Sequence, residues 1–423
     1  MGPFGSSNVE LLFRSTDHSR NAPHPAILDL RFLVNPSLTI IIGTGSCSVV
    51  DGNEREEPEA EMDVRADTNS YEAWLARFCP LDASDLAFKH EQLSNDTDPF
   101  PFFRGTYYRW ARLWAANCPK LLDAPRILAI GDLHLENYGT WRDADGRLCW
   151  GVNDFDEVDD LPYTNDLVRL AASTRFAKKA GLLDAKFGVA CEAILDGYRG
   201  SLTAGGKPFV LETHHPHLRA VAMAAERDPI HFWTKLTALL AEPAVEPPDE
   251  AKAALVAALP GVGLTPTFRV RSQAGVGSLG KPRYVVIVEW CGGWICREAK
   301  AVTPPATAWV AGQTELGVSR MGEAVRRATR SPDPFYQPGP AWVTRRLAPH
   351  CSRIELAHLA SGDVERVLHG MGAEVANVHL GTKEAAAVIL RDLSQRPANW
   401  LMDGASTMAD ATEQDWAAWR RVE

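Results

Sequence analysis

The sequence has little that would cross-link the chain or hold a structural metal. Its eight cysteines include no C-x-x-C pair and no zinc-type spacing, and they stand at positions 47, 79, 118, 149, 191, 291, 296 and 351. Disulfide frameworks and zinc modules depend on such spacings, so neither is expected here. We predict reduced, mostly buried thiols and a cytoplasmic protein.

Long apolar runs and basic stripes are also missing. The run from Leu38 to Gly43 is too short to span a membrane, and no basic segment followed by a cleavage site indicates a signal peptide. The chain has 44 Lys and Arg against 54 Asp and Glu, which gives a formal net charge of −10. We therefore expect neither a nucleic-acid partner nor a membrane partner.

The N-terminal segment lacks a sustained apolar period. It includes an acidic, proline-containing stretch from Asp51 to Glu61. These features predict a loosely ordered tail over residues 1–66. The chain has 423 residues, 45% of them hydrophobic, and is long enough for two or three structural units.

The most informative stretch begins with a short apolar run. Ile127 to Ile130 predicts a buried strand, and the loop after it contains Asp132, His134 and Asn137. A histidine inside such a loop is more often a structural hydrogen-bonding residue than a chemical one, and we interpret His134 in that way.

A second acidic cluster follows a predicted turn. The turn at Asp143 to Gly146 folds the chain back into a strand at Leu148 to Val152. That strand ends on the sequence Asn-Asp-Phe-Asp-Glu, residues 153–157. We expect the turn to bring the two acidic clusters together.

The two clusters have the residue types that phosphoryl transfer requires. Asp132 and Asn137 stand five positions apart, the D-x-x-x-x-N spacing of the protein-kinase catalytic loop. Asp154-Phe155-Asp156 stands where a kinase has Asp-Phe-Gly. The alternative is that these are ordinary turn residues in a solvated loop, but two clusters in this order favour a catalytic centre.

A second region, beginning near Thr265, predicts a strand, a glycine loop and two further strands. Gly275, Gly277 and Gly280 form G-x-G-x-x-G, and a strand follows them, which excludes a Rossmann site. The pattern fits a kinase-type loop whose amides, including that of Ser278, bind phosphates. Lys300, on the third strand, is the matching lysine. The alternative is a plain glycine hairpin.

Two downstream segments have helical patterns. Met321 to Ala328 predicts a helix that would present Glu323 as the ion-pair partner of Lys300. Apolar residues then recur at helical spacing from Val364 to His379. Upstream, Arg104 in the string PFPFFRG predicts a core wedge paired with an interior acid, with phosphate binding as the alternative.

The order of these segments differs from that of ordinary kinases, because the catalytic loop precedes the glycine loop. Moving residues 265–381 in front of residues 100–260 restores the usual order. The sequence therefore predicts an α+β, protein-kinase-like fold of two lobes that is circularly permuted. A small antiparallel sheet lobe from residues 261–350 would bind the nucleotide, over a mainly helical lobe made by residues 67–260 and 351–423.

Two resemblances accompany this interpretation. GDLHLEN, NDFDE and the following DLVRL helix resemble aminoglycoside and choline phosphotransferases, in which a G-D-x-H-x-x-N loop, an acidic metal strand and a D-L-A helix follow in that order. That resemblance implies that Asp132 is the base and that Asn137 and Asp154 are metal ligands. Over residues 70–400, the strings PFPFFRG, GDLHLENYG, NDFDE, DLVRLAAS, GVGSLGKPRY and REAKA together resemble an uncharacterised bacterial family, domain of unknown function 2252. This resemblance implies a kinase-like fold without an established substrate.

The leading functional hypothesis is a phosphotransferase that uses ATP and Mg²⁺ and acts on a small hydroxyl metabolite or a protein. Asp132 would orient the hydroxyl, while Asn137, Asp154 and Asp156 would bind Mg²⁺. The alternatives are nucleotidyl transfer, with ATP turned around in the same pocket, and a nucleotide-binding pseudokinase that regulates a partner. The sequence does not identify the acceptor or the oligomeric state.

Overall fold

The structure is a computed structural model that describes residues 40–43, 46–49, 63–222, 228–261, 263–273, 275–315, 317–351, 353 and 361–421. The chain divides into two units, one ending at Met62 and the other running from Asp63 to Glu423. In the first unit, strands β1 (Ile40–Gly43) and β2 (Ser46–Val49) pair antiparallel. The rest of the predicted tail up to Met62 lies outside the described residues. Helix α1 begins at Val64, so the predicted boundary at residue 66 falls inside it.

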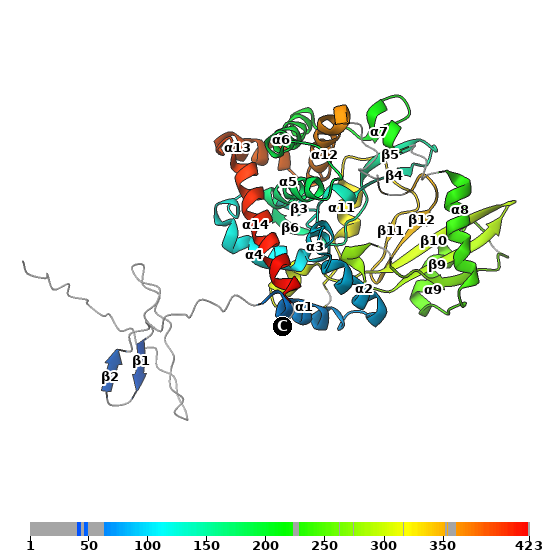
Figure 1. Cartoon of the computed structure of the whole chain (residues 1–423), viewed down its shortest axis with the longest axis horizontal. Helices are drawn as coiled ribbons and strands as arrows, with labels where there is room; N and C mark the ends of the chain where they lie inside the picture. Colours follow the sequence, from blue (N-terminus) through cyan, green and yellow to red (C-terminus); the bar gives the residue numbers. More distant parts are fainter. Residues whose placement is uncertain are drawn as a thin grey trace, which may run out of the picture. The chain divides into compact units, whose positions relative to one another are not determined.

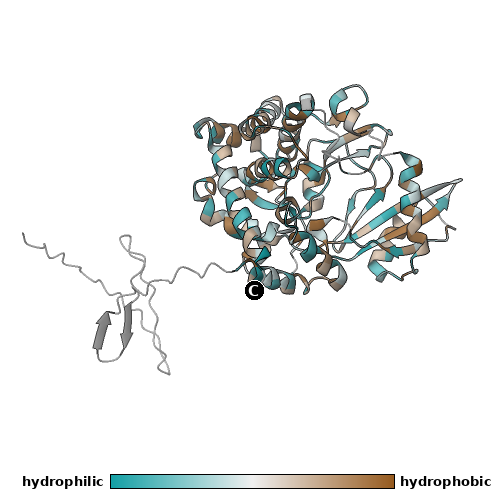
Figure 2. Ribbon diagram, in the orientation of Figure 1, coloured by the Kyte–Doolittle hydropathy of each residue, from teal (hydrophilic) through white to brown (hydrophobic). Residues whose placement is uncertain are grey.

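A five-stranded antiparallel sheet forms one side of the second unit (Figure 1). Its order is β11-β12-β10-β9-β8, with β8 Thr267–Val270, β9 Arg283–Trp290, β10 Gly293–Ala301, β11 Gln337–Pro338 and β12 Trp342–Leu347. Figure 2 shows hydrophobic and hydrophilic stretches along its strands. On β9, Val285 and Ile287 pack into one buried cluster and Val286 and Val288 into another, because successive side chains of a strand point to opposite sides.

Three helical segments that precede the sheet in sequence pack against it. Helix α9 (Asp249–Ala257) joins a cluster containing Phe268 and Val286, while α8 (Pro229–Thr237) joins one containing Ile287 and Cys296. Between them, η4 (Ala238–Ala241) accepts hydrogen bonds from Arg269 at two of its carbonyls. Residues 228–260 fall within the range 67–260 predicted for the helical lobe, and their apolar contacts are with the sheet.

The other side of the unit is mainly helical (Figure 1). Apart from α10 (Ala306–Val310) and α11 (Met321–Arg327), its helices are α1 Val64–Leu75, α2 Ala83–Leu93, α3 Phe100–Gly105, α4 Tyr107–Asn117, α5 Tyr163–Lys179, α6 Phe187–Ala204, α7 Pro216–Ala222, α12 Val364–His379, α13 Ala385–Gln395 and α14 Trp400–Arg420. Short 3-10 turns are η1 Pro119–Leu121, η2 Leu135–Asn137, η5 Val276–Ser278 and η7 Ser361–Asp363. The helix predicted over Val364 to His379 is confirmed as α12.

Helices α6 and α12 pack unusually close to one another. A Cβ at Gly372 would lie 2.0 Å from the carbonyl oxygen of Ile194, and one at Gly197 would lie 1.9 Å from that of His369. Each helix therefore needs a residue without a side chain where the two backbones meet. Nearly every residue of α5, which is also in contact with both helices, is buried.

Two small antiparallel sheets carry the acidic segments. Strand β3 (Arg126–Ala129) pairs with β6 (Asp159–Pro162), and β5 (Leu148–Val152) pairs with both β4 (Tyr138–Arg142) and β7 (Phe209–Val210). The predicted turn joins β4 to β5, so it folds the chain back as expected. Strands β4 and β6 were not predicted.

The two helices between β10 and β11 belong to the helical core. Trp309 of α10 (Ala306–Val310) packs edge-on against Tyr71 and Tyr108, and Met321 of α11 (Met321–Arg327) is buried in the same large cluster. Residues 261–350 are therefore not a separate body. The unit is a mixed α+β structure with small antiparallel sheets.

Two general features of the described residues concern their helices and their cysteines. None of their helices is long and apolar enough to cross a membrane. The described cysteine side chains are free thiols, and five of them are buried: Cys79, Cys118, Cys149, Cys191 and Cys296.

Candidate functional site

A cavity of about 720 Å³ lies between the sheet and the helical part. Of the predicted site residues, it is lined by Asp132, Asn137, Asp154, Asp156, Gly275, Gly277, Ser278 and Lys300. Gly280 and Glu323 are not among its lining residues. The structure thus brings the predicted catalytic loop, acidic cluster and glycine loop to one place.

Asp132 is held by a buried arginine that sequence analysis missed. Arg169 of α5 donates from Nε to Asp132 Oδ1 at 2.7 Å and from Nη2 to the carbonyl oxygen of Phe103 at 2.9 Å. Its guanidinium lies over the rings of Phe103, Tyr107 and Trp110 at 4.2 to 4.9 Å. Burial raises the pKa of Asp132 even though the charge of Arg169 opposes this. A fixed carboxylate of raised pKa suits a general base.

The loop that carries Asp132 is fastened to α5 and α12. Asp166 Oδ2 and Oδ1 accept hydrogen bonds from the amides of Ile130 and Gly131 at 2.7 and 2.9 Å. The Oδ2 atom also lies 2.9 Å from His379 Nε2. Gly131 has φ +85°, and a Cβ there would lie 2.2 Å from the carbonyl oxygen of Glu157. Only glycine allows the loop to approach the acidic segment so closely.

His134 and Asn137 brace one another in a capping box. His134 Nδ1 accepts from the amide of Glu136 at 3.2 Å, and Asn137 Oδ1 accepts from the amide of His134 at 2.7 Å. Burial lowers the pKa of His134 well below its usual range, which favours the neutral ring. The structural interpretation of His134 therefore agrees with the geometry. An amide oxygen has two lone pairs, so the Asn137 oxygen can accept or coordinate once more.

Lys300 meets the acidic cluster directly. Its Nζ lies 2.6 Å from Asp156 Oδ2 and 3.7 Å from Asp154 Oδ1. Lys281, also buried, lies 3.9 Å from the same Asp156 oxygen. Burial would raise the pKa of Asp156, but the charges of Lys300 and Lys281 outweigh it and lower the pKa. Asp156 is thus a paired carboxylate, whereas the Asp154 side chain is 42% exposed.

The glycine segment, residues 275–280, lies over Asp132. A Cβ at Gly277 would lie 3.7 Å from Asp132 Oδ2 and 3.0 Å from the carbonyl oxygen of Arg104. Ser278 accepts a hydrogen bond from Arg283 and is thereby tied to β9. Gly280 instead faces Leu86, and its carbonyl accepts from the amide of Asp82. It is a turn residue with φ +91° and not part of the cavity wall.

The expected pair between Glu323 and Lys300 does not form, and this prediction is wrong. Glu323 Oε2 lies 3.0 Å from Arg320 Nε, and its Oε1 lies 2.8 Å from Arg327 Nη1. Those arginines stand one helical turn before and after Glu323 on α11. The residues of α11 that face the core are Met321 and Ala324.

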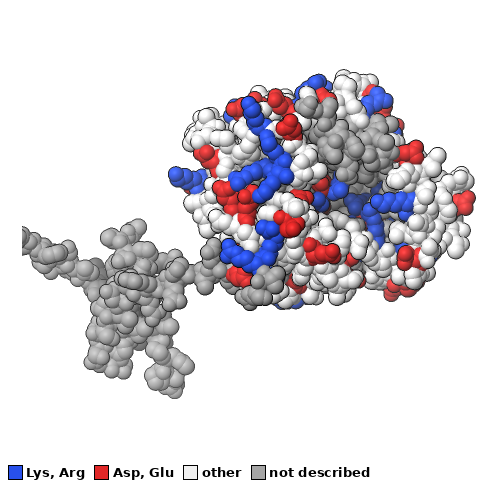
Figure 3. Space-filling model, viewed as in Figure 1, with Lys and Arg blue, Asp and Glu red and all other residues white. Residues whose placement is uncertain are grey.

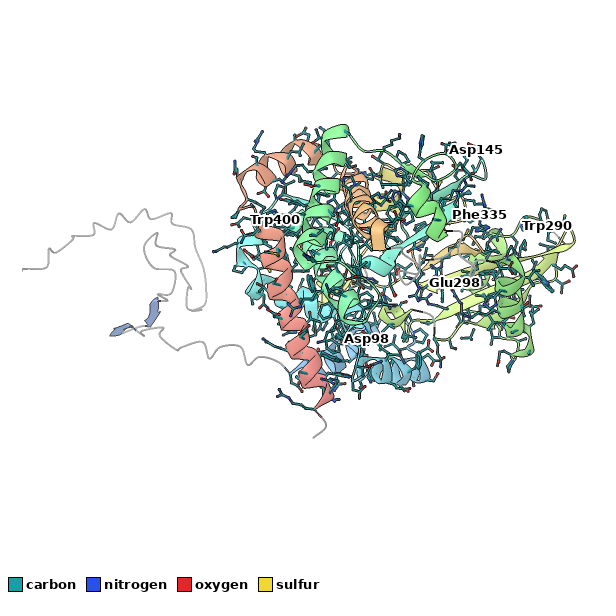
Figure 4. All side chains as sticks on the ribbon, turned by 45° about the horizontal axis from the view of Figure 1, so that its top comes forward. Asp98, Asp145, Trp290, Glu298, Phe335 and Trp400 are labelled. Carbon is teal, nitrogen blue, oxygen red and sulfur yellow. The ribbon has the colours of Figure 1, made fainter. Side chains whose placement is uncertain are left out.

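Glu298 provides the acid closest to Lys300 on its own strand. It is fully buried on β10 and pairs with three arginines, Arg271, Arg283 and Arg345. Burial would raise the pKa of Glu298, but the charges of Arg345, Arg271 and Arg283 hold it well below its usual range. Figure 4 shows Glu298 inside the molecule, whereas Trp290 lies at the outer tip of the β9–β10 hairpin.

Arg104 has the predicted structural partner. Its Nη1 lies 2.6 Å from Glu136 Oε2, which Arg353 also contacts at 2.5 Å. The phenylalanines of the same string are buried, as a core wedge requires. Arg104 also lines the cavity, so the predicted alternative, contact with an anion, is compatible with its position.

The cavity is positive although the chain as a whole is negative. Among the described residues, ten Lys and Arg side chains line it against six Asp and Glu side chains. Figure 3 shows Lys and Arg atoms gathered in the recess between the two sides of the unit. Arg330 Nε and Nη1 and Arg346 Nε are buried without a partner among the described residues. These cations favour an anionic ligand.

The carboxylates fit a magnesium ion held jointly with a ligand. The described residues contain no group of three or more His, Cys, Asp or Glu that could hold a metal alone. Magnesium usually takes one or two carboxylates together with substrate phosphates. Asp154 and Asn137, which both line the cavity, have the oxygen atoms for that arrangement.

The residues that sequence analysis missed share one property. Arg169, Lys281 and the arginines around Glu298 act through partners from distant segments. One sequence signal was available, because Glu298 and Lys300 lie two apart on a strand and share a face.

The chain also matches a described family. Residues 81–233 and 267–422 match the model of a family described as an uncharacterized protein conserved in bacteria, DUF2252. These ranges cover well over half of the sequence, so the protein belongs to the DUF2252 family. No match was found among the curated proteins or among the solved structures. The segment between the two ranges contains η4 and α9.

Proposed function

We propose that this protein is an ATP- and Mg²⁺-dependent phosphotransferase with a permuted, kinase-like arrangement. The observation that carries the proposal is the meeting of Lys300 with Asp156 and Asp154, at 2.6 and 3.7 Å, beside Asp132 and under the glycine segment. Kinases use the same set: a lysine on the third strand, an acidic metal-binding segment and a catalytic aspartate.

The connectivity of the large sheet supports the proposal. Strands β8, β9 and β10 are consecutive neighbours, the glycine segment joins the first two, and Lys300 is on the third. Helix α12, which follows the sheet in sequence, is tied to the catalytic loop through His379 and Asp166. Both features agree with a kinase order in which the sheet segment has moved behind the catalytic loop.

Each residue has a role in this reaction. The acceptor hydroxyl attacks the γ-phosphorus of ATP, the bond to the ADP oxygen breaks, and the hydroxyl proton passes to Asp132. Arg169 orients that carboxylate. Lys300 and the amides of the glycine segment bind phosphates, and Asp154 and Asn137 hold Mg²⁺, which offsets phosphate charge when bound.

The test is incubation of the protein with bacterial lysate and ATP labelled at either the γ or the α position. Label transfer from the γ position, lost in Asp132→Asn, is the expected result. Transfer from the α position alone would indicate nucleotidyl transfer. ATP binding without transfer from either position would indicate a pseudokinase.

A further inference from the structure

The arginines around Glu298 occupy a distinctive place in the cavity. Arg345 lies opposite Glu298 on β12, and Arg283 lies opposite Lys300 on β9. Arg271 follows β8, and its amide donates to the carbonyl oxygen of Arg283. All three line the cavity, and the side chains of Arg271 and Arg345 are about one-third exposed.

This group has more hydrogen-bond donors than Glu298 can satisfy. Three guanidinium groups carry about fifteen N–H donors, whereas one carboxylate accepts about four hydrogen bonds. The group also keeps two net positive charges after pairing with the ionised Glu298. Arg271 and Arg345, which line the cavity and are partly exposed, therefore have N–H donors to spare.

The position differs chemically from the same position in a kinase. The kinase lysine motif is V-A-I-K, so an alanine stands two residues before the lysine and shares its face of the strand. In this chain Glu298 stands there, beneath its arginines. A small apolar wall at this point is replaced by a charged one, which suits phosphate oxygens and not the face of an aromatic base.

We propose that Arg271, Arg283 and Arg345, oriented by Glu298, form a second phosphate-binding subsite in the cavity. It is separate from the subsite of Lys300 and the glycine segment, although Arg283 links the two through Ser278. The ligand therefore carries phosphate at this end as well. The inference that this ligand is a substrate of phosphoryl transfer rests on the proposed function. The existence of the anion site does not depend on that function.

The subsite is tested by calorimetric titration of the full chain with inorganic pyrophosphate in buffer free of nucleotide and divalent metal. Arg345→Gln and Arg271→Gln should each weaken binding at least about tenfold, because each removes a charged donor fork. Arg320→Gln is the matched control, because Arg320 also pairs with a glutamate but lies outside the cavity lining. The pyrophosphate affinity of Arg320→Gln should equal that of the wild type.

A purely structural role for the arginines gives a different result. Unchanged pyrophosphate affinity in both single variants, Arg345→Gln and Arg271→Gln, when folded, would overturn the proposal. A wild-type protein that binds no pyrophosphate would also overturn it. Should a Gln variant fail to fold, the pyrophosphate affinity of the corresponding Arg→Lys variant is measured instead. Lysine keeps a charge for Glu298 but loses the planar fork, so its affinity should also fall.

ATP titration of the same variants identifies the source of the phosphate. Weakened ATP binding in Arg345→Gln means that the phosphates of the nucleotide itself occupy the subsite, with ATP turned around. Unchanged ATP binding together with weakened pyrophosphate binding means that the acceptor substrate already carries a phosphate group, which occupies the subsite. Failure of the proposed function would appear separately, as a wild-type protein that binds pyrophosphate but transfers no label from ATP.

Discussion

At the scale of single residues, the candidate base is defined by its partner. Arg169 contacts Asp132 through Nε and Nη2 and also donates to the Phe103 carbonyl, so the aromatic string around Phe103 indirectly fixes the carboxylate. An arginine enclosed by three rings loses few conformations on binding, because packing has already restricted it. The geometry of the base is therefore set before any ligand enters.

Replacing Asp132 by Asn should lower turnover about a thousandfold, because the amide cannot accept the proton of the acceptor. Affinity for Mg²⁺ and ATP, measured by titration, should stay within about threefold, since Asp132 binds neither in the proposed mechanism. Asp160→Asn, an exposed acid paired with Arg126, serves as the control. Near-normal turnover in a folded Asp132→Asn protein would remove the catalytic assignment.

How far the site follows from sequence depends on the distance between partners. Asp132, Asn137, Asp154 and Asp156 were predicted from short spacings within one stretch, and all four line the cavity. The predicted pair between Glu323 and Lys300 does not form, because the sequence of α11 does not indicate which face of the helix is directed toward Lys300. The arginines around Glu298 escaped detection for a similar reason, since strand pairing and not sequence brings them together.

At the scale of elements, α6 and α12 approach closely where each has a glycine. Gly372→Ala should destabilise the protein by about 2–3 kcal/mol, because the new Cβ would overlap the carbonyl of Ile194 and force the helices apart. Urea unfolding measures the change. Gly370→Ala on the same helix is the control, because its Cβ would meet Phe209 and Trp150 at an ordinary 3.8 Å. Equal stability of the two variants would contradict the close-approach argument.

Helix α12 also contains a titrating carboxyl. Glu374 is buried, accepts from the amide of Val152 at 3.3 Å and from Asn377 Nδ2 at 2.9 Å, and burial raises its pKa to about 7 although Arg330 opposes the shift. A carboxyl whose folded pKa is raised stabilises the fold at low pH. That contribution is lost as the pH rises from about 4.5 to about 7.

Glu374→Gln should therefore remove part of the pH dependence of the unfolding free energy. The wild type should lose up to about 3 kcal/mol more than the variant between pH 4 and pH 8. Urea unfolding at the two pH values measures this, with the exposed Glu365→Gln as control on the same helix. Parallel pH profiles of the wild type and Glu374→Gln would contradict the assignment.

Element boundaries show what sequence patterns can and cannot supply. The turn between β4 and β5 was predicted because its residues favour it locally. Strand β6 was missed because Asp159 to Pro162 has neither alternation nor β-branched residues, and its pairing with β3 alone makes it a strand. The packing of α8 and α9 against the sheet could not be predicted, because an apolar face does not identify its partner.

At the scale of the whole molecule, a positive cavity stands within a chain of net charge −10. Salt screens such an attraction, so affinity for ATP should fall roughly tenfold between 50 and 500 mM KCl. Titration at both concentrations measures it, and adenosine, which carries no phosphate, is the control. Salt-independent ATP binding would mean that the cavity cations do not contact phosphate.

The link between Asp166, the amides before Asp132 and His379 has a consequence for biosynthesis. The loop and Asp166 are synthesised early, yet His379, which contacts Asp166, arrives only with α12. Contacts so far apart in sequence close late, because loop closure must precede the gain from the contact. A nascent chain therefore presents its acidic loop with the Asp166 contacts but without His379 until α12 leaves the ribosome, and a product that stops before α12 lacks that contact.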